Sequence, residues 1–385
     1  MKTKRREGFR LKGAVLRVLL VLVLSVFLAG CGQQQARTAV EEADVPAHDH
    51  AAASADTKTE DDQQEPYTLR VGIATSLGSQ LGFIAEHEGF FKEEHLNVEF
   101  VPFQTTADGL NALQAGKIDI GISFGTAGPL TFIANGANFV IFGGHLEGGS
   151  PILARPEDAD KYKDLRDFKG KKIGTIRLYT GDIVFRTALA EAGIDWRKDV
   201  EIIEFKNASI LLDAIKSGKV DVGVGAPSNL AKANEAGLVA VAWSNDLLPG
   251  HVCCRVVAQG AELENKQEAF KRFIKALIKA ERVKEQNPEV TVEASEPYLK
   301  LDKETIRQIT LEPHQNNYSD PNKKAVEQLW NAMRQIGYIP ADVSVKIENH
   351  INTEIYRQAI TELLEEHPDD PFYQKVKERF ERQNS

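Results

Sequence analysis

One sequence segment, called the repeated phrase below, occurs twice in this chain, and the repeat restricts the folds that the chain can adopt. The first copy is ALQAGKIDIGISFGTAGP (112–129) and the second is AIKSGKVDVGVGAPSN (214–229). The residues that return, each 102 positions later, are Gly116 as Gly218, Asp119 as Asp221 and Gly121 as Gly223. In both copies a helical pattern ends at a glycine, which accepts the left-handed conformation that follows a helix. An aspartate then opens a strand in which the small glycine lets a neighbouring element approach.

Taken once, such a phrase is an ordinary connection between a helix and a strand. Two copies, each followed by a loop of Gly, Ala, Ser or Thr, favour a pair of similar α/β units. In open α/β sheets a ligand binds beyond the carboxyl ends of the strands. The repeat therefore predicts two binding edges, with a ligand between them.

Strand and helix patterns alternate through most of the chain. Strands are predicted at 67–74, 96–103, 117–124, 138–144, 171–178, 200–205, 219–225 and 238–244, with helical patterns between them. This alternation indicates parallel sheets with right-handed crossovers. From Glu262 the chain is predicted to be helical, with Phe270, Phe273 and Leu277 on a packing face that Trp330 and Tyr338 share.

The N-terminus, 1–30, is predicted to be a lipoprotein signal peptide. A basic head precedes an apolar run, 18–28, which as a helix spans about 16 Å and is too short for a hydrocarbon core of roughly 30 Å. The sequence LAGC (28–31) resembles a bacterial lipobox, which implies cleavage before Cys31 and a lipid on its sulfur. An ordinary secretory signal with an incidental cysteine is the alternative. The lipobox predicts a protein held on the extracytoplasmic side of the bacterial cell membrane by its lipid.

Residues 31–66 are predicted to be a disordered tether beginning at the lipidated Cys31, because large apolar side chains are almost absent. The HDH stretch (48–50) is interpreted as solvated spacer, and no metal site is predicted. Without the seven basic and one acidic residues before Cys31, the formal net charge falls from −9 to −15. Such a charge argues against nucleic acid as a partner.

Several further stretches occur in the order and spacing of a known family. They are EGFFKEEHLNVEFVPF (88–103), LQAGKIDIG (113–121), DLRDFKGKKIGT (164–175), IKSGKVDVGV (215–224), YSDPNKKAVEQLWNAMRQIGYI (318–339) and ENHINTEIYRQAI (348–360). The chain resembles the substrate-binding lipoproteins of ABC importers, in the nitrate/sulfonate/taurine branch that includes binders of thiamine-pyrimidine precursors. The resemblance covers nearly all of 67–385.

The resemblance implies a type II periplasmic-binding-protein fold, in which two α/β lobes joined by crossing strands close over a central cleft by a hinge. Lobe 1 is expected at 67–147 plus 250–385, with the C-terminal helices, and lobe 2 at 148–249. The expected partners are a small-molecule ligand, an ABC permease with its ATPase, and the membrane through Cys31. The protein is expected to be a monomer without a cofactor.

The same resemblance places ligand contacts in loops that follow strands. They are Thr75, Ser76, Leu77, Gly78, Ser79, Gln80, Gln104, Thr105, Gly125, Thr126 and Ala127 in lobe 1, and Tyr179, Thr180, Gly181, Asp182, Gly225, Ala226 and Pro227 in lobe 2. Independently of any family, a helix N-terminus presents free N–H groups that suit a carboxylate, sulfonate or phosphate. Any single Ser or Thr there also serves as a plain N-cap.

Two charged residues leave the ligand's charge open. Arg177 can hold an oxyanion through its guanidinium or form a surface salt bridge. Asp182 can pair with Arg177, cap its helix or receive an amine of the ligand. A zwitterion such as taurine satisfies both signs, as does a cationic or neutral heterocycle. His145, after the first crossing, is either a cleft residue or a structural histidine.

The adjacent Cys253 and Cys254 are expected where the second crossing strand re-enters lobe 1, with one buried and the other, Cys254, facing the cleft. Neighbouring Cα atoms about 3.8 Å apart are closer than disulfide geometry prefers, so a vicinal disulfide would be strained. The pair and His251 lack the spacing of a usual zinc loop.

Three functions are compatible with these patterns. The first is a binding protein that delivers a solute to a permease, which needs no chemistry. The second is an enzyme, since one branch of this fold synthesises a thiamine pyrimidine precursor with a cysteine-rich iron motif. The third is a ligand sensor without transport. We expect the first, because only the Cys253–Cys254 pair is present, without clustered histidines, and an exported lipoprotein is a poor setting for such an enzyme.

Overall fold

The computed structural model describes residues 65–74, 79–299 and 301–385, which belong to one compact unit, Glu60–Ser385. The predicted signal peptide, Cys31, the tether up to residue 64 and the loop residues Thr75, Ser76, Leu77 and Gly78 lie outside the described residues. Within the described part, no helix combines the length and the apolar character needed to cross a bilayer.

The first sheet includes two strands, β10 and the short β11, that return from later in the chain. Its bounds are β1 (Tyr67–Ala74), β2 (Leu96–Phe103), β3 (Ile120–Gly121), β4 (Phe139–Gly148), β10 (Val252–Gln259) and β11 (Gln315–Asn316). The strand order is β11-β4-β10-β3-β1-β2, with β1 parallel to β2 and β3, and β10 antiparallel between β3 and β4. The predicted parallel arrangement therefore holds for the N-terminal strands, whereas the returning strand β10 reverses direction.

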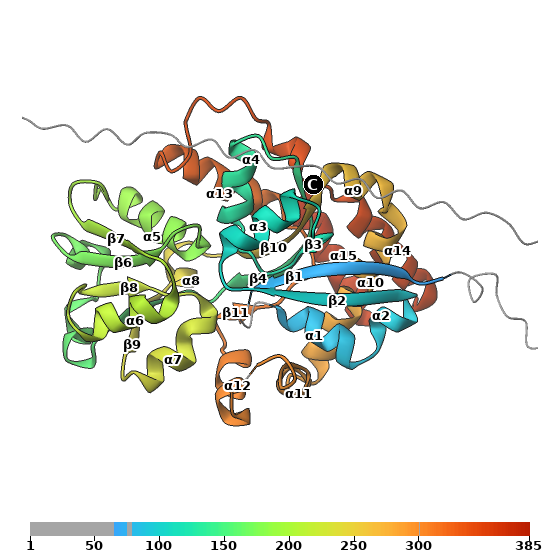
Figure 1. The fold of residues 1–385 in the computed structure, drawn as a ribbon, viewed down its shortest axis with the longest axis horizontal. Helices are drawn as coiled ribbons and strands as arrows, with labels where there is room; N and C mark the ends of the chain where they lie inside the picture. The colour runs from blue at the N-terminus through green and yellow to red at the C-terminus, as the bar shows by residue number, and fades with distance from the viewer. Residues whose placement is uncertain (1–64, 75–78, 300) are drawn as a thin grey trace, which may run out of the picture. The chain divides into compact units, whose positions relative to one another are not determined.

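The second sheet is formed by the chain between β4 and β10. Its bounds are β5 (Pro151–Ala154), β6 (Lys172–Ile176), β7 (Glu201–Phe205), β8 (Val222–Val224) and β9 (Val239–Trp243). The order is β7-β6-β8-β5-β9, with β6 parallel to β7 and β8, and β5 antiparallel to β8 and β9. Figure 1 shows the two sheets as separate α/β lobes, which confirms the predicted fold class.

Helices cover both faces of the first sheet (Figure 1). One face is covered by α1 (Gln80–His87), α2 (Phe90–Glu93), α9 (Gly260–Asn265), α10 (Gln267–Gln286), α11 (Val290–Ser295), α14 (Glu354–Glu366) and α15 (Pro371–Asn384). The other face is covered by α3 (Thr106–Gln114), α4 (Ala127–Ala134) and α13 (Lys323–Gln335). Val256 and Ala258 of β10 pack with the first set and Val257 with the second, as the pleat of a strand requires.

The packing face predicted for α10 is confirmed, because Phe270, Phe273 and Leu277 are fully buried. The expectation that Trp330 and Tyr338 share this face is wrong. Both residues pack on the opposite face of the sheet, with α3 and α4. Periodicity identifies the apolar side of a helix but not the face of a sheet that it covers.

The second sheet is also covered on both faces. Its helices are α5 (Thr180–Glu191), α6 (Ala208–Lys216), α7 (Leu230–Glu235) and α8 (Ser244–Leu247), while α12 (Lys303–Thr310) packs beside α7. Short 3₁₀ turns occur at Pro156–Lys161, Leu165–Phe168, Pro227–Asn229 and Ile347–His350. Ile152 of β5 packs with α5, and its neighbour Leu153 packs with α6 on the opposite face.

The chain passes between the sheets twice, and the two passages are bonded together. The first passage is short, because β4 ends at Gly148 and β5 begins at Pro151. In this passage the N–H of Gly149 donates to Asn245 Oδ1 at 2.8 Å, and the N–H of Ser150 donates to Ser244 Oγ at 3.0 Å. Gly149 has φ +86, in the left-handed region that glycine adopts readily.

The repeated phrase ends a helix in the same way in both lobes. Gly116, after α3, has φ +66, and Gly218, after α6, has φ +73. The prediction that these glycines take the left-handed conformation after a helix is confirmed. The strand that follows is shorter than predicted in the first copy, because β3 ends at Gly121 rather than at Phe124.

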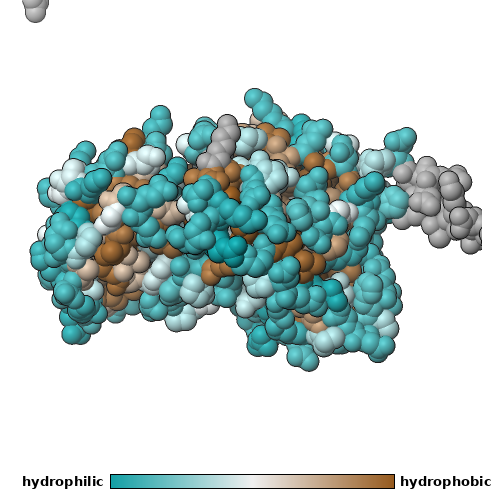
Figure 2. Space-filling model, turned by 90° about the horizontal axis from the view of Figure 1, so that it is seen from below, coloured by the Kyte–Doolittle hydropathy of each residue, from teal (hydrophilic) through white to brown (hydrophobic). Residues whose placement is uncertain are grey.

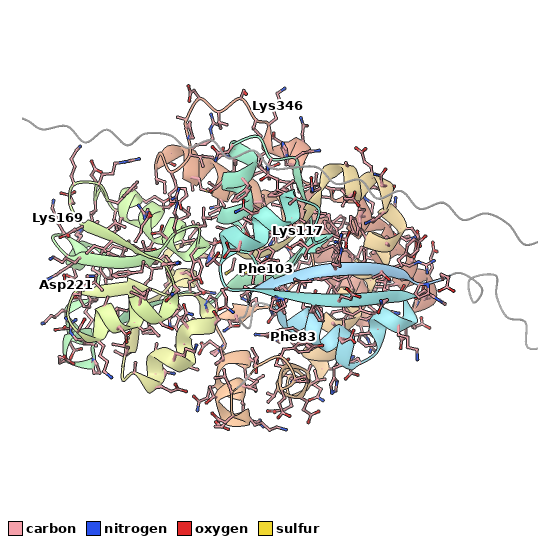
Figure 3. The ribbon with its side chains drawn as sticks, viewed as in Figure 1. Phe83, Phe103, Lys117, Lys169, Asp221 and Lys346 are labelled. Carbon is pink, nitrogen blue, oxygen red and sulfur yellow. The ribbon has the colours of Figure 1, made fainter. Side chains whose placement is uncertain are left out.

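The aspartates of the repeat bind a neighbouring strand in the same way. Asp119 Oδ2 accepts the backbone N–H of Arg70 at 2.8 Å, and the Asp119 N–H donates to the Arg70 carbonyl at 2.8 Å. Asp221 makes both bonds to Lys172, also at 2.8 Å. Figure 3 shows Asp221 at the outer side of its lobe and Phe103, the last residue of β2, on the side toward the other lobe. The aspartates thus fix the amino ends of the parallel strands, while the carboxyl ends point inward.

The shortened β3 has a packing cause. Phe124 turns out of the sheet, and its ring occupies space left by Gly72, Gly109 and Gly121. A Cβ on any of these glycines would lie within 3 Å of the ring, at 2.2 Å in the case of Gly109. The Phe124 ring therefore packs between β1, α3 and β3, at the place where β3 would otherwise continue.

The visible surface is mainly hydrophilic, with apolar side chains in hollows between polar ones (Figure 2). Among the described large apolar residues, only Ile210 and Tyr298 are exposed. Tyr298 stacks on Phe83, with ring centroids 4.2 Å apart. Most of the apolar surface of the described chain is thus used in packing.

Candidate functional site

The carboxyl ends of strands from both sheets meet at one cavity of about 60 Å³. Its lining residues are Ala74, Thr106, Ser123, Gly125, Leu146, Ser150, Leu178, Tyr179, Thr180, Gly181, Ala226, Pro227, Ser228, Cys253 and Cys254. Ala74 ends β1, and Ala226 follows the end of β8 in the other lobe. The cavity therefore lies where open α/β sheets bind ligands.

The two lobes bind each other at this cavity through Thr180. Its Oγ1 accepts the backbone N–H of Thr126 at 3.0 Å and that of Ala127 at 3.2 Å. These N–H groups begin α4 and have no partner within the helix. The Thr180 hydroxyl also donates to the carbonyl of Cys253 at 3.0 Å, and the Thr126 hydroxyl donates to the same carbonyl at 3.1 Å. One side chain of lobe 2 thus satisfies three backbone groups of lobe 1.

A β-bulge brings both cysteines to the cavity. In β10, Val252 pairs with Glu147 and Cys254 pairs with Leu146, so Cys253 is an extra residue on its strand. A bulge of this kind re-aims side chains that would otherwise alternate between faces. The two Sγ atoms lie 3.8 Å apart, and both residues are buried. The expectation that only one of the two cysteines faces the cleft does not match this geometry.

The two thiols have different acidities. The hydrogen bond between them, together with burial, raises the pKa of Cys253 well above its usual range. The same hydrogen bond lowers the pKa of Cys254, against the opposing effect of burial.

The lining is polar without being charged. Among the described lining residues, none is an Asp, Glu, Lys, Arg or His. The side-chain hydroxyls belong to Thr106, Ser123, Ser150, Tyr179, Thr180 and Ser228. Burial raises the pKa of Tyr179, so this phenol keeps its proton at neutral pH. Gly181, in the first turn of α5, adds a helix N-terminus to these donors.

Sequence comparison places the chain in a family. The sequence pattern described as NMT1/THI5 like matches residues 81–291, which is more than half of the 385 residues. The chain belongs to the NMT1/THI5-like family. A protein of Brucella abortus described as a binding protein is 29% identical over 244 residues, which cover 62% of this chain and 73% of that protein.

Solved structures show the fold of this NMT1/THI5-like chain. The periplasmic nitrate-binding protein NrtA from Synechocystis PCC 6803 matches with a TM-score of 0.66 and 17% identity, over 78% of this chain and 89% of that one. The periplasmic aliphatic sulphonate binding protein SsuA from Escherichia coli matches with a TM-score of 0.62 and 19% identity, over 75% and 92%. The predicted periplasmic-binding-protein fold is confirmed, as is the resemblance to the nitrate and sulfonate branch.

Many of the ligand contacts predicted from the resemblance to substrate-binding lipoproteins lie at the cavity. Those that line it are Gly125, Tyr179, Thr180, Gly181, Ala226, Pro227 and Cys254. Thr126 and Ala127 lie directly behind them, bound to Thr180. Ser79 is fully buried, and its hydroxyl donates to the lining residue Ser123 at 3.1 Å.

Gln80 and His145 lie in a buried polar cluster instead of in the lining. Gln80 and Asn317 accept hydrogen bonds from the ammonium of Lys284, on α10. Burial lowers the pKa of Lys284 to about 7. Burial and the nearby charges of Lys284 and Arg255 lower the pKa of His145 well below its usual value, so this histidine stays neutral.

The two charged candidates are separated from each other and from the cavity lining. Asp182 is fully buried and binds Arg186, four residues on in α5, at 2.8 Å. Burial raises the pKa of Asp182 although Arg186 opposes it. Arg177 is exposed and borders a different surface hollow, with Thr131 and Phe132 of α4. The sequence suggested that Asp182 pairs with Arg177, caps its helix or binds an amine of the ligand. Its partner in the structure is Arg186.

The remaining predicted residues have structural contacts of their own. Thr105 caps α3 by accepting the N–H of Asp108 at 3.1 Å, and Gln104 before it is exposed. The N–H of Gly225 donates to the Pro151 carbonyl at 2.9 Å, which joins β8 to β5. These residues lie at strand ends, as predicted, but outside the set that lines the cavity.

Some lining residues were not predicted, notably Ser123, Ser150 and Ser228. Ser123 lies within the stretch expected to be a regular strand, and it reaches the cavity because β3 ends early. Ser150 follows the glycines of the first crossing, and Ser228 follows Pro227. The only sequence pattern that marks these serines is a small polar residue next to Gly or Pro at a strand end. This pattern is too common in proteins to identify residues that line a cavity.

Proposed function

We propose that this protein is the extracytoplasmic solute-binding component of an ABC importer. It captures a small anionic or zwitterionic solute, such as nitrate, taurine or another sulfonate, between its lobes and delivers it to the permease. The bond between Thr180 and the start of α4 at the cavity is the observation that carries this proposal. The lobes also meet outside the cavity, where Ile183 of α5 packs into the core of lobe 1 and Arg197 donates to the Ile336 carbonyl, so admitting a solute requires these contacts to part as well.

The donors around the cavity suit an oxyanion. The first turn of α5 presents the N–H groups and partial positive charge of a helix N-terminus, and Thr180 and Gly181 from this turn line the cavity. Six hydroxyls surround it, and the described lining holds no carboxylate to repel an anion. Neutral donors of this kind bind a nitrate or sulfonate group without a counter-charge.

The cavity volume limits the solute. About 60 Å³ holds on the order of four to six water molecules, at roughly 10–15 Å³ each. A nitrate ion or a sulfonate head group fits this space. A larger heterocycle would require the lobes to separate further.

The residues that line the cavity support binding of a solute rather than its chemical conversion. The lining contains two thiols and several hydroxyls, but among the described residues neither a histidine nor a carboxylate that would accept their protons. The Brucella relative is described as a binding protein, and NrtA and SsuA are named for binding nitrate and sulfonates. Lobe 1 in this proposal comprises 67–147 and 250–385, and lobe 2 comprises 148–249.

Solute-dependent stability tests the proposal. Full-length Cys31→Ser protein is heated with nitrate, taurine, ethanesulfonate, a pyrimidine or a flavin. A true ligand at a hundred times its Kd adds about 2.7 kcal/mol of stability and raises the Tm. Thr180→Val should lose most of this shift, whereas Thr361→Val, on the exposed side of α14, should keep it. A panel without any shift, or a shift that Thr180→Val leaves intact, would reject this cavity as the site.

Transport and anchoring need separate tests. Deleting the gene should abolish cellular uptake of the solute that raises the Tm. Normal uptake in the deletion strain would favour a ligand sensor without transport. Cys31→Ser should abolish metabolic labelling of the protein with a radioactive fatty acid, and continued labelling would reject the lipid anchor.

A further inference from the structure

Cys253 and Cys254 lie at the contact between the lobes that borders the cavity, one of several contacts that join them. The bulge in β10 places both Sγ atoms in the cavity, 3.8 Å apart. The peptide group between the two residues contains the Cys253 carbonyl, which accepts the hydroxyls of Thr126 and Thr180. The same peptide group therefore joins the two thiols and holds the contact between the lobes.

A disulfide between adjacent cysteines closes a ring that includes this peptide group. Adjacent Cα atoms are about 3.8 Å apart, whereas disulfides prefer roughly 4.4–6.8 Å. The ring can close only if the peptide between the residues twists, and twisting re-aims its carbonyl oxygen. Thr126 and Thr180 would then lose their common acceptor.

We propose that Cys253 and Cys254 form a redox modification site, at which oxidation to a vicinal disulfide releases the Cys253 carbonyl and loosens the contact between the lobes. The reduced pair holds the lobes together at the cavity, and the oxidised pair favours their separation. No bound solute is needed, so the experiment below can fail without affecting the proposed solute binding, while the supply of an acceptor disulfide rests on the extracytoplasmic location proposed above.

The chemistry requires an acceptor disulfide, such as oxidised glutathione or the disulfide of a thiol oxidoreductase. The Cys254 thiolate attacks one sulfur of the acceptor and expels the other as a thiolate, which leaves a mixed disulfide on Cys254. Cys253 then gives its proton to the expelled thiolate and attacks the Cys254 sulfur, which releases the second acceptor sulfur as a thiolate that takes a proton from water. In total two protein thiols are oxidised and one acceptor disulfide is reduced to two thiols.

The site suits a reversible modification. Strained disulfides have more oxidising potentials than relaxed ones and are reduced more easily. Both cysteines are buried, with 5% and 7% of their surface exposed, so an acceptor reaches them only when the lobes part. Disulfide exchange partners are found in the extracytoplasmic compartment proposed above.

The test uses full-length Cys31→Ser protein, in which Cys253 and Cys254 are the remaining thiols. The protein is equilibrated in glutathione buffers from fully reduced to fully oxidised, unfolded, alkylated with iodoacetamide and weighed. The reduced form should gain two carbamidomethyl groups. The oxidised form should gain none and lack two hydrogens.

Hydrogen exchange at Thr126 and Ala127 measures the coupling to the lobes. These amides donate to Thr180, so oxidation should speed their exchange about tenfold, while amides of α14 stay unchanged. Cys254→Ser cannot form the disulfide, and its exchange should be the same in both buffers. If it does not fold, Cys253→Ser serves instead.

Either of two results would overturn the proposal. In the first, the pair stays fully alkylated even in oxidised glutathione. In the second, the disulfide forms but exchange at Thr126 and Ala127 does not change.

Discussion

The hydroxyl of Thr180 lies 3.0 Å from the backbone nitrogen of Thr126 and occupies the position that a small anion would take at the start of α4. The two residues are 54 positions apart and belong to different lobes. A neutral hydroxyl supplied by lobe 2 therefore lies on a helix N-terminus of lobe 1.

Removing that hydroxyl should weaken the closed state. Thr180→Val keeps the side-chain shape but leaves the N–H groups of Thr126 and Ala127 without their acceptor. Buried unsatisfied groups cost about 1–3 kcal/mol, so guanidinium unfolding should show a loss of that size. Thr361→Val, whose hydroxyl bonds only within exposed α14, should change stability by less than about 0.5 kcal/mol. Equal stability of the two variants would contradict this account.

The buried pair of Asp182 and Arg186 should be sensitive to removal of one partner. Arg186 is 3% exposed, and its guanidinium also lies 4.4 Å from the centre of the Trp196 ring. Arg186→Met leaves the Asp182 carboxylate buried without compensation and should cost about 3–5 kcal/mol.

The double variant Asp182→Leu with Arg186→Met should be more stable than Arg186→Met alone, because it removes the buried unpaired charge and leaves only the half-exposed Glu204 without its partner. Chemical unfolding of all three variants gives the comparison. A single variant within about 1 kcal/mol of the wild type would show that the pair is dispensable.

Lys284 should make stability increase with pH. Burial lowers its pKa from 10.5 in the unfolded chain to about 7 in the folded protein. Between these values the unfolded chain holds a proton that the folded protein lacks, so stability rises by up to about 1.4 kcal/mol per pH unit from pH 7 upward. Below pH 7 both states are protonated and this contribution is constant. In Lys284→Met, the slope of the free energy of unfolding against pH, measured between pH 7.5 and 9.5, should be smaller by this amount. An unchanged slope would show that the pKa of Lys284 is not lowered.

The first aspartate of the repeat, Asp119, should make stability depend on pH. Burial raises the pKa of Asp119, but hydrogen bonds from Arg70 and Lys266 outweigh it and lower the pKa overall. A lowered pKa means stability that is present above about pH 4 and is lost as pH falls through the folded value. Asp119→Asn should therefore cost about 1–2 kcal/mol at pH 6 and less at pH 3.

Asp221→Asn is the matched control. Asp221 accepts the N–H of Lys172 as Asp119 accepts that of Arg70, without the additional ion pairs to Arg70 and Lys266. Its cost at pH 6 should be smaller. Urea unfolding at both pH values measures the difference, and equal costs for the two variants would count against it.

The sequence predicted local features well and non-local ones poorly. The glycines after α3 and α6 were predictable, because a helix end depends on its own residues. The bonds from Asp119 to Arg70 were not, since the partner lies 49 positions earlier and is fixed only by the order of the strands. Arg186 was missed although its spacing of four from Asp182 is a recognised helical pair.

The cysteines show the same limit. Alternation along a strand predicts opposite faces for neighbours, and only the register of β10 against β4 produces the bulge that turns both inward. That register is set by residues far away in the chain. Family resemblance located the strand ends at the cleft but did not distinguish the residues that line it.

The placement of the second sheet between β4 and β10 has a consequence for how the chain folds. Gly144 of β4 pairs with Arg255 of β10, and the chain between them forms the whole second sheet, from Pro151 to Trp243. Joining distant strands is entropically costly, and the cost falls once the intervening segment has become compact. Ser150 and Ser244 are bonded where the two passages meet, so a completed second lobe delivers β4 and β10 to each other as near neighbours. If lobe 2 folds slowly in a newly made chain, β4 keeps an edge that β10 has not yet paired. Such an edge can pair with another chain, so we expect slow folding of lobe 2 to promote aggregation.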